Sequence, residues 1–185
     1  MPLVFEFGFL GIGVSRGEPT IPFLFGNEPV PTTRFGAFDV SGDELPAAPK
    51  ECTVAVLDSP AGLHGKRLKA LLNEMDKVVV PVSPSRFDMM ASREFFEELS
   101  GTKAVRKDKV DIGIIGMRVD PRTNASKQLV EFLQQFDLPL VTCIRQAQRY
   151  VHAVESGVTL FDASNIDPVD RLQWKPLLDW LVKRR

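Results

Sequence analysis

The 185-residue sequence lacks the features that mark membrane-spanning and secreted proteins. No apolar run approaches the ~18–20 residues that a membrane-spanning helix requires, and the first residues lack the basic start of a secretory signal. Cysteine is scarce as well, because Cys52 and Cys143 are the only two in the chain. Each lies beside or within an apolar run, which favours buried, reduced thiols over a disulfide or a shared metal. We therefore expect a cytoplasmic protein with no transmembrane segment.

An excess of charge of either sign is also missing. The chain has 23 lysines and arginines against 24 aspartates and glutamates, and its net charge of −1 gives no whole-molecule argument for binding nucleic acid or an anionic membrane. The two histidines, His64 and His152, are far apart, and neither has a metal-ligating neighbour at short spacing. The sequence also has no nucleophile elbow and no Cys/His pair, so we assign no catalytic residue.

The absence with the largest consequence is that of a glycine-rich phosphate loop. Such a loop needs the pattern Gly-x4-Gly-Lys-Ser/Thr, because backbone N–H groups, a lysine and a hydroxyl must all face the phosphates and their metal. The only Gly-Lys dipeptide, at 65–66, is followed by Arg67, and Pro60 stands where the first glycine would be. The glycines at 11 and 13 have no lysine partner. We therefore expect that these residues do not hydrolyse ATP on their own.

The composition divides the chain into two parts, residues 1–50 and residues 51–185. The first part holds 7 of the 14 prolines, 7 of the 13 glycines and 7 of the 13 phenylalanines, and it shows no sustained helical or alternating pattern. Its prolines break any long helix, and short strands at 4–10 and 22–25 are the only elements that we expect in it. Residues 1–50 are therefore predicted to be an irregular segment before a regular domain.

From residue 51 onward, short apolar strands alternate with amphipathic helices. This order is typical of an α/β protein, so we predict a doubly wound, mostly parallel sheet with helices on both faces. Ser85 is the expected N-cap of one helix, with the acidic Asp88 three positions on, and Pro176 is expected to kink or break the last helix. The helix at 86–99 has an apolar residue at every fourth position, and these form one apolar stripe: Phe87, Ala91, Phe95 and Leu99. The expected strands are 53–57, 77–82, 112–115, 140–144 and 158–161, and the expected helices are 66–73, 86–99, 124–136, 147–155 and 168–183.

Asp58 is the first candidate for a ligand-binding residue. It follows the strand at 53–57, whose short apolar run indicates a buried, interior parallel strand, and ligands bind at the carboxyl ends of such strands. A carboxylate there can hold Mg²⁺ directly or through water, while Pro60 and Gly62 would let the next turn approach a phosphate and change shape when it leaves. The alternative is that Asp58 caps the following helix, and the spacing alone does not separate the two.

Two further loops follow strands and carry arginine. Arg118 could stack on a base, and Asp120 could accept a hydrogen bond from a ribose or an amino group. Alternatively, this loop is a solvated turn in which Asp120 caps the next helix. Arg145 and Arg149 lie four residues apart, so in a helix they share a face that could meet an acidic partner or a nucleic-acid backbone. The alternative for these two is the solvent-facing start of a helix.

Four segments between residues 53 and 162 resemble, in the same order, the ParA/MinD family of deviant-Walker ATPases. Residues 54–62 (VAVLDSPAG) look like the Walker B and switch II segment of that family, and residues 78–88 (VVVPVSPSRFD) look like its next strand and turn. Residues 114–120 (IIGMRVD) are similar to its Asn-Arg-Val type segment near the adenine, and residues 150–162 (YVHAVESGVTLFD) are similar to its late helix and the ending that follows.

The resemblance implies a P-loop NTPase-like sheet of the SIMIBI type, with ATP and Mg²⁺ as cofactors. By position, Asp58 would hold the metal, and the nucleotide would be bound by residues of the same loops: Ser59, Pro60, Gly62, Arg118 and Asp120. The resemblance further implies a homodimer, a ParB-like or cargo-adaptor partner, and binding to nonspecific DNA or a membrane surface. The role that it implies is the positioning of plasmids, chromosomes, division sites or carboxysomes.

The departures from the family are as informative as the matches. Its members open with a strand and Lys-Gly-Gly-x-Gly-Lys-Ser/Thr, which this N-terminus lacks, and Met117 stands where an asparagine near the adenine is expected. Three interpretations follow: a degenerate member that no longer hydrolyses ATP, an N-terminus that was truncated or misread, or a phosphate cradle of unrecognisable sequence. Under the second, the sheet would lack a central strand and would expose apolar edges.

The sequence thus favours a ParA-like partitioning or positioning protein that has a degenerate Walker A region and is degenerate or truncated for ATP hydrolysis. The alternative function is a nucleotide-independent module that docks a partner protein or DNA through Arg145 and Arg149. A third function, the ATP-dependent ligation or amidation of a small carboxylic acid, needs the absent phosphate loop and ranks last.

Overall fold

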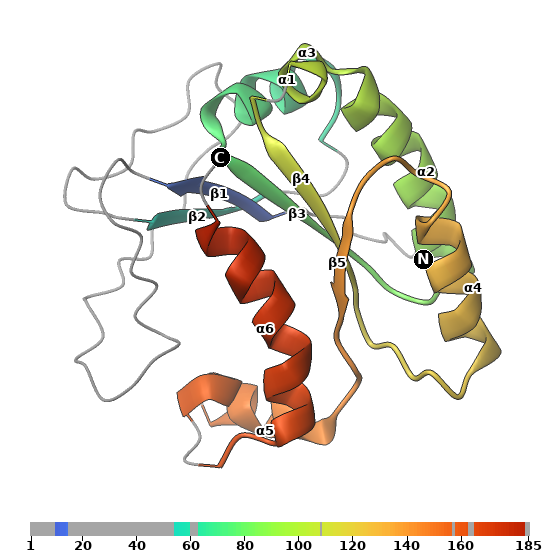
Figure 1. The fold of residues 1–185 in the computed structure, drawn as a ribbon, viewed down its shortest axis with the longest axis vertical. Helices are drawn as coiled ribbons and strands as arrows, with labels where there is room; N and C mark the ends of the chain where they lie inside the picture. The colour runs from blue at the N-terminus through green and yellow to red at the C-terminus, as the bar shows by residue number, and fades with distance from the viewer. Residues whose placement is uncertain are drawn as a thin grey trace, which may run out of the picture.

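A computed structural model describes residues 10–14, 54–59, 63–107, 109–156, 158–162 and 165–183 of the chain. It contains a small parallel sheet of three strands with helices on both sides, which confirms the α/β class (Figure 1). Lys77 pairs with Asp111 and Val82 pairs with Gly116, so the two longer parallel strands are in full register. The three strands, in their order across the sheet, are β3 (Lys77–Val82), β4 (Asp111–Gly116) and β5 (Leu140–Cys143).

Six α-helices and one 3₁₀ turn accompany the sheet in the part of the chain that the structure describes. Five of the helices lie where the sequence predicts them, and the short α3 is an addition. None of the described helices combines the length and the apolarity needed to cross a lipid bilayer. In chain order they are α1 (Gly65–Glu74), α2 (Arg86–Gly101), α3 (Lys103–Arg106), α4 (Asn124–Leu133), α5 (Gln148–Glu155), η2 (Leu160–Asp162) and α6 (Pro168–Val182).

Both faces of the parallel sheet are covered, as the nearly continuous apolar sequence of its strands predicts. Val78 and Ile114 belong to the larger core cluster, which the apolar sides of α1, α2 and α4 complete. On the opposite face, Val79 and Ile115 pack with Leu177 of α6. The alternation of side chains along β3 and β4 therefore assigns α6 to one face and the other three helices to the other face.

Gly113 marks the closest approach of α6 to the sheet. A Cβ at this position would lie 2.8 Å from Val141 Cγ2 and 3.0 Å from Trp180 Cζ2, so only glycine fits without movement of its neighbours. The same Trp180 ring lies 4.6 Å, centroid to nitrogen, from the ammonium group of the buried Lys77. Lys77 also pairs with Asp111 at 3.2 Å, which gives its buried charge a partner.

Two strands extend the sheet in an arrangement that the sequence did not predict. The strand order is β2-β1-β3-β4-β5, where β1 (Leu10–Val14) is antiparallel to both β3 and β2 (Val54–Asp58). The prediction of an interior parallel strand at 53–57 was therefore wrong, because within the described residues β2 is the outermost strand and pairs with β1 alone. Apolar periodicity predicts that a strand is buried, but it does not choose the strand beside it.

β1 lies between β2 and β3, in the interior of a sheet that would lack a central strand if the N-terminus were truncated. Because β1 is antiparallel to both of its neighbours, β2 and β3 still run in the same direction. Leu10 is the one residue that β1 shares with the strand predicted at 4–10, and the strand predicted at 22–25 lies outside the described residues.

The buried face of α2 differs from the predicted stripe. Phe87 and Ala91 are exposed, whereas Ser92, Phe96 and Leu99 are buried. The helix carries two neighbouring stripes, and the one with Phe96 is buried. The ring of Phe96 lies edge-on to that of Phe136, which follows α4, with centroids 4.8 Å apart. The predicted N-cap is confirmed, since the hydroxyl of Ser85 accepts a hydrogen bond from the backbone N–H of Asp88 at 3.5 Å.

The segment at 158–161 was wrongly predicted to be a strand. It is part of a tight turn into η2, in which the carboxylate of Asp162 accepts hydrogen bonds from the backbone N–H and the hydroxyl of Thr159 at 2.6 and 2.7 Å. A local side-chain partner thus replaces the ladder that a strand would need. Pro176 does not break the last helix, because α6 continues through it as one element.

Candidate functional site at the carboxyl edge of the sheet

The loops after β3, β4 and β5 meet at one edge of the sheet. The backbone N–H of Met117 donates to the carbonyl of Val82 at 2.8 Å, and that of Ile144 donates to the carbonyl of Gly116 at 2.7 Å. The N–H of Val119 then donates to the carbonyl of Ile144 at 3.0 Å. These bonds hold the three strand ends together at the edge where doubly wound proteins bind their ligands.

Arg118 has an unusual backbone in this edge. Its φ of 54° lies in the left-handed region, which costs a residue other than glycine ~1–2 kcal/mol. The hydrogen bonds of Met117 and Val119 hold the backbone on either side of it, and Val119 is buried while Arg118 is exposed. Such a conformation persists only where the surrounding structure enforces it, and here it directs a cation away from the packed strands.

Gly116 brings β4 and β5 together just below Arg118. A Cβ at Gly116 would lie 2.8 Å from Cys143 Sγ and 3.2 Å from Val119 Cγ2. The thiol of Cys143 therefore packs directly against the glycine, and its partial burial raises the pKa of that thiol. This agrees with the expected role of Cys143 as a packed, reduced thiol.

Asp120 is committed to a contact within its own loop. Its carboxylate accepts hydrogen bonds from Nε and Nη2 of Arg122 at 2.9 and 2.8 Å and from the backbone N–H of Arg122 at 3.0 Å. These bonds lower the pKa of Asp120 to about 2. A hydrogen bond from a ribose, as predicted, would compete with Arg122 for the same oxygens, so this contact stays a prediction.

The alternative prediction, that the Asp120 side chain caps the next helix, was wrong. The N-cap of α4 is Thr123, whose hydroxyl oxygen accepts from the backbone N–H of Ser126 at 3.2 Å. Asp120 takes part through its backbone: its carbonyl accepts from the N–H of Thr123 at 2.9 Å, and its N–H donates to the hydroxyl of Ser126 at 2.9 Å. The buried Ser126 thus joins the loop to the first turn of α4.

The predicted metal and phosphate residues lie at the end of β2. Asp58 is the last residue of β2 and is paired with Leu10, which in turn lies opposite Val79 of β3. Since β3 continues for three more residues to Val82, the backbone of Asp58 is ~10 Å short of the carboxyl edge at ~3.3 Å per residue. Ser59 is buried. The side chain of Asp58 and all of Pro60 and Gly62 lie outside the described residues, so the metal and phosphate site expected there stays a prediction.

The start of α1, just after that turn, is held by a residue that sequence reasoning missed. The carboxylate of Glu98 on α2 accepts the backbone N–H of Gly65 at 2.7 Å and contacts Nδ1 of His64 at 2.8 Å. The hydrogen bonds from His64 and Gly65 lower the pKa of Glu98. Glu98 lies 34 positions from His64, and no local pattern in the sequence points to this pairing.

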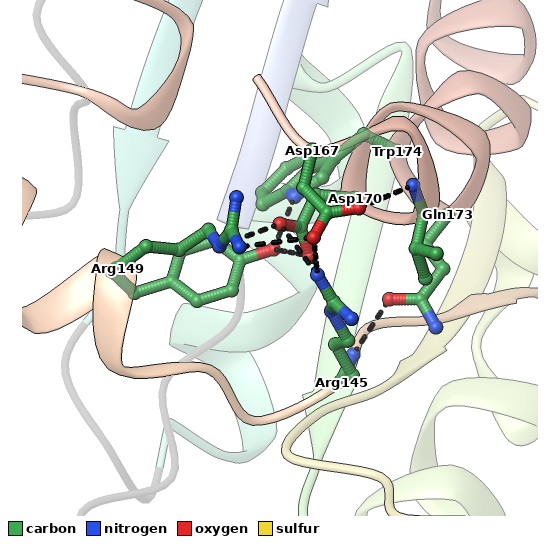
Figure 2. Close-up of polar contacts among 8 residues, drawn as sticks. Arg145, Arg149, Asp167, Asp170, Gln173 and Trp174 are labelled. Carbon is green, nitrogen blue, oxygen red and sulfur yellow. Dashed lines mark hydrogen bonds and ion pairs between the residues drawn. The ribbon is translucent and has the colours of Figure 1, made fainter. Parts of the chain in front are cut away.

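Arg145 and Arg149 do not form the open basic face that we considered. Arg145 lies before the first residue of α5, and both guanidinium groups point toward Asp167 and Asp170 at the start of α6 (Figure 2). Arg145 pairs with Asp170 at 2.7 Å and with Asp167 at 2.8 Å. Arg149 pairs with the same two carboxylates at 3.2 and 2.9 Å. The two arginines are thus paired within the chain and do not form a free basic face. The predicted solvent-facing helix start fails for Arg145, which lies outside the helix, whereas Arg149 lies in the first turn of α5 with its side chain 40% exposed.

Further polar contacts fasten this cluster to the end of β5. The backbone N–H of Arg145 donates to Oε1 of Gln173 at 2.9 Å, and the hydroxyl of Thr142 donates to the carbonyl of the same residue at 2.7 Å (Figure 2 shows the first of these bonds). The indole N–H of Trp174 donates to the hydroxyl of Tyr150 at 2.9 Å. Pairing with the two aspartates raises the pKa of Arg145, and the arginine lowers the pKa of Asp167.

The described residues of this edge do not by themselves fit a magnesium–nucleotide complex. In the described part of the chain, no group of three or more His, Cys, Asp or Glu residues could hold a metal ion. Of the predicted nucleotide contacts whose side chains are described, Ser59 is buried, Asp120 is bonded to Arg122, and Arg118 is exposed. We therefore derive no chemical step through ATP or Mg²⁺.

Comparison with known proteins gives one informative relative, and no family model matches the chain. The chain is 23% identical over 150 residues to "Maintenance of carboxysome distribution protein A" of Halothiobacillus neapolitanus (strain ATCC 23641 / c2). The match covers 80% of this chain, so it extends beyond the 135 residues from 51 to 185 into the first 50. It covers 64% of that protein, so the chain spans less than two thirds of its relative's length. This distant homology supports at most the ParA/MinD-like resemblance of the sequence.

Proposed function

We propose that the chain is a ParA/MinD-like positioning protein that distributes a large cellular cargo and does not hydrolyse ATP on its own. The observation that carries the proposal is the similarity to a carboxysome distribution protein over 80% of the chain. The four ParA/MinD-like segments, which lie in the same order as in that family, support the same role. By the name of its relative, the cargo class that we propose is a carboxysome or a similarly large body.

The positioning role is tested in the cells that carry the gene. We expect deletion of the gene to replace evenly spaced cargo, labelled with a fluorescent component, by clusters, and re-expression of the full chain to restore the spacing. We expect re-expressed Arg118→Ala to restore the spacing less well than the wild type, because Arg118 is an exposed cation with a constrained backbone at the carboxyl edge. Arg171→Ala, another exposed arginine, on α6, is the matched control. Cargo spacing that is unchanged by the deletion contradicts the role.

The proposed lack of independent hydrolysis rests on the missing phosphate loop. It is tested by phosphate release and by equilibrium binding of a fluorescent ATP analogue in the presence of Mg²⁺. We expect no phosphate release above the buffer rate. Asp58→Asn and Asp137→Asn carry the same charge change, at the end of β2 and in an exposed loop before β5. Phosphate release that is lost in the first variant and kept in the second would contradict this part of the proposal.

The alternative, nucleotide-independent docking through Arg145 and Arg149, is not favoured in that form. Both arginines are paired with Asp167 and Asp170, so an anionic partner would have to displace two carboxylates of the chain itself. We expect Arg145→Ala/Arg149→Ala to act mainly by releasing α6, which circular dichroism and thermal unfolding would detect before any binding assay.

A further inference from the structure

Residues 64–67, at the start of α1, are exposed between two buried leucines. We call these residues the α1 entry segment. Leu63 before it and Leu68 after it both belong to the larger core cluster. The two leucines occupy the positions at which a hydrophobic staple fixes the entry of the chain into a helix. The core therefore anchors both ends of the α1 entry segment and leaves its middle to other contacts.

The α1 entry segment lacks the usual stabilisation of a helix start. Its N-cap residue, His64, makes no side-chain capping bond, and the first turn has no acidic residue. Lys66 and Arg67 instead place two cations in that turn, where the partial positive charge of the helix N-terminus disfavours them. Gly65 has a φ of 65°, and a glycine has about equal access to negative φ values. The local sequence thus gives the ordered turn little support.

A carboxylate from α2 supplies what the segment lacks. Oε1 of Glu98 accepts the backbone N–H of Gly65 at 2.7 Å, and Oε2 contacts Nδ1 of His64 at 2.8 Å. The hydrogen bonds from His64 and Gly65, together with the positive charge of Lys69, lower the pKa of Glu98, so the carboxylate is ionised at neutral pH. Within the described residues, no other side chain bonds to the backbone of 64–67. Loss of this one group would therefore release both contacts together.

We infer that the α1 entry segment is a local conformational switch that Glu98 holds in its ordered form. In that form the N–H groups of residues 68–70 bond to carbonyls of the segment, four residues back, as in any α-helix. Without the carboxylate the segment opens between its two anchors, and these bonds break while Leu63 and Leu68 stay in the core. Because Glu98 belongs to α2, a displacement of α2 at this residue changes the order of the chain that joins β2 to α1.

Hydrogen exchange in the full chain tests the inference, with residues 68–70 as the reporter and residues 112–115, inside the parallel sheet, as the reference. In the wild type we expect faster exchange at 68–70, at a rate independent of low urea concentrations, because a local opening exposes little surface. Glu98→Ala should speed the exchange at 68–70 about fivefold, the typical effect of a lost N-terminal cap, and leave it independent of urea. Glu97→Ala, its exposed neighbour on α2, is the matched control and should change neither property.

Two further changes alter the α1 entry segment itself. Gly65→Ala affects the backbone conformation alone, because no atom lies within 4 Å of its Cβ. It should speed the exchange at 68–70 by about five- to thirtyfold, which corresponds to the cost of a left-handed conformation for a residue other than glycine. In the Glu98→Ala background, Lys66→Glu places the missing acid in the first turn and should slow the exchange again. Lys69→Glu, the same charge change beyond that turn, should slow it less.

Three results would overturn the inference. The first is a wild-type exchange at 68–70 with the urea dependence of residues 112–115, because the segment would then open only with the whole fold. The second is exchange that Glu98→Ala leaves unchanged, and the third is an equal effect of Glu98→Ala and Glu97→Ala. The inference does not rest on the proposed positioning role, so none of these results bears on the cargo-spacing test of that role.

Discussion

Asp170 is fully buried, and both of its carboxylate oxygens face arginines. Arg145 donates to both oxygens, at 2.7 and 3.0 Å, and Arg149 contacts the second of them at 3.2 Å. A buried carboxylate is tolerated only when such partners replace water. The converse also holds, because removal of one charge from a buried group of this kind leaves its partners uncompensated.

We expect Asp170→Asn to lower the free energy of unfolding by about 3 kcal/mol, since two arginines then share Asp167 alone. Asp179→Asn on the same helix is the control. Asp179 forms an exposed pair with Lys175, and pairs of this type contribute no more than ~0.5 kcal/mol. Urea unfolding of both variants compares the two losses. Equal losses would show that the buried ion pairs of Asp170 contribute no more to stability than the exposed pair of Asp179.

Two buried serines have opposite surroundings, and their alanine variants should have opposite effects. The hydroxyl of Ser92 on α2 is buried and has no hydrogen-bond partner among the residues that the structure describes, so Ser92→Ala should raise the free energy of unfolding by about 1 kcal/mol. The hydroxyl of Ser126 on α4 accepts the N–H of Asp120, so Ser126→Ala should lower it by about 1 to 2 kcal/mol. Thermal or urea unfolding measures both, and a loss in both variants would mean that Ser92 has a partner after all.

At the scale of elements, the first turn of α1 depends on a carboxylate from α2. The N-cap residue His64 makes no side-chain capping bond to its own helix, and Glu98 satisfies the N–H of Gly65 instead. Gly65 has a φ of 65°, which glycine adopts without the penalty of a side chain. The junction between the β2 turn and α1 is therefore fixed by a contact between helices.

This contact should make stability depend on pH in one direction. The pKa of Glu98 is lowered from its ordinary value of 4.5, so its contribution is complete above pH 4.5 and is lost as the pH falls through the lower, folded-state pKa. We expect Glu98→Gln to be less stable than the wild type at pH 6, and the difference to shrink as the pH falls below 4.5. Urea unfolding across this range tests the expectation. Glu97→Gln, its exposed neighbour, should show no such convergence.

The packing of α6 on the sheet should also affect stability, because it leaves no room for one added methyl group. Gly113→Ala places a Cβ within 3.0 Å of Val141 and Trp180, so we expect a loss of ~1–3 kcal/mol. Gly101→Ala is the control, because no atom lies within 4 Å of its Cβ and the residue is helical. There we expect no loss, since alanine is the better helix former. If Gly113→Ala were as stable as Gly101→Ala, α6 would be able to move away from the sheet without a loss of stability.

The elements that depend on local signals were the ones best predicted from the sequence. β3 has the bounds that its apolar run indicates, and Ser85 caps α2 as its spacing to Asp88 predicts. The predictions that failed depend on partners far along the chain. Periodicity alone could not choose between the two apolar stripes of α2, and it could not anticipate that Asp170 would neutralise Arg145 from 25 positions away.

At the scale of the whole molecule, the first part of the chain supplies a strand to the second. β1 comes from residues 1–50, yet it lies between β2 and β3 and hydrogen-bonds to both. The candidate site was predictable to the extent that its loops follow parallel strands. The ion pairs of Asp120, Arg145 and Arg149 were not predictable, because they arise from how the loops and α6 pack.

Removal of residues 1–50 should therefore disturb the sheet unevenly. We expect the shortened chain to expose the edges of β2 and β3 and to self-associate, because unpaired strand edges recruit other strands. Hydrogen exchange should become fast at 54–58 and remain slow at 112–115, inside the parallel sheet. Size-exclusion chromatography with light scattering measures the association. A monomeric fragment with slow exchange at 54–58 would show that β1 is dispensable.

The pairing of Arg145 with Asp170 also has a mechanical consequence. It joins the end of β5 to the start of α6 directly, across 25 positions of sequence. A pull on α6 would travel to the sheet through this bridge and bypass the polypeptide between Glu155 and Asn165.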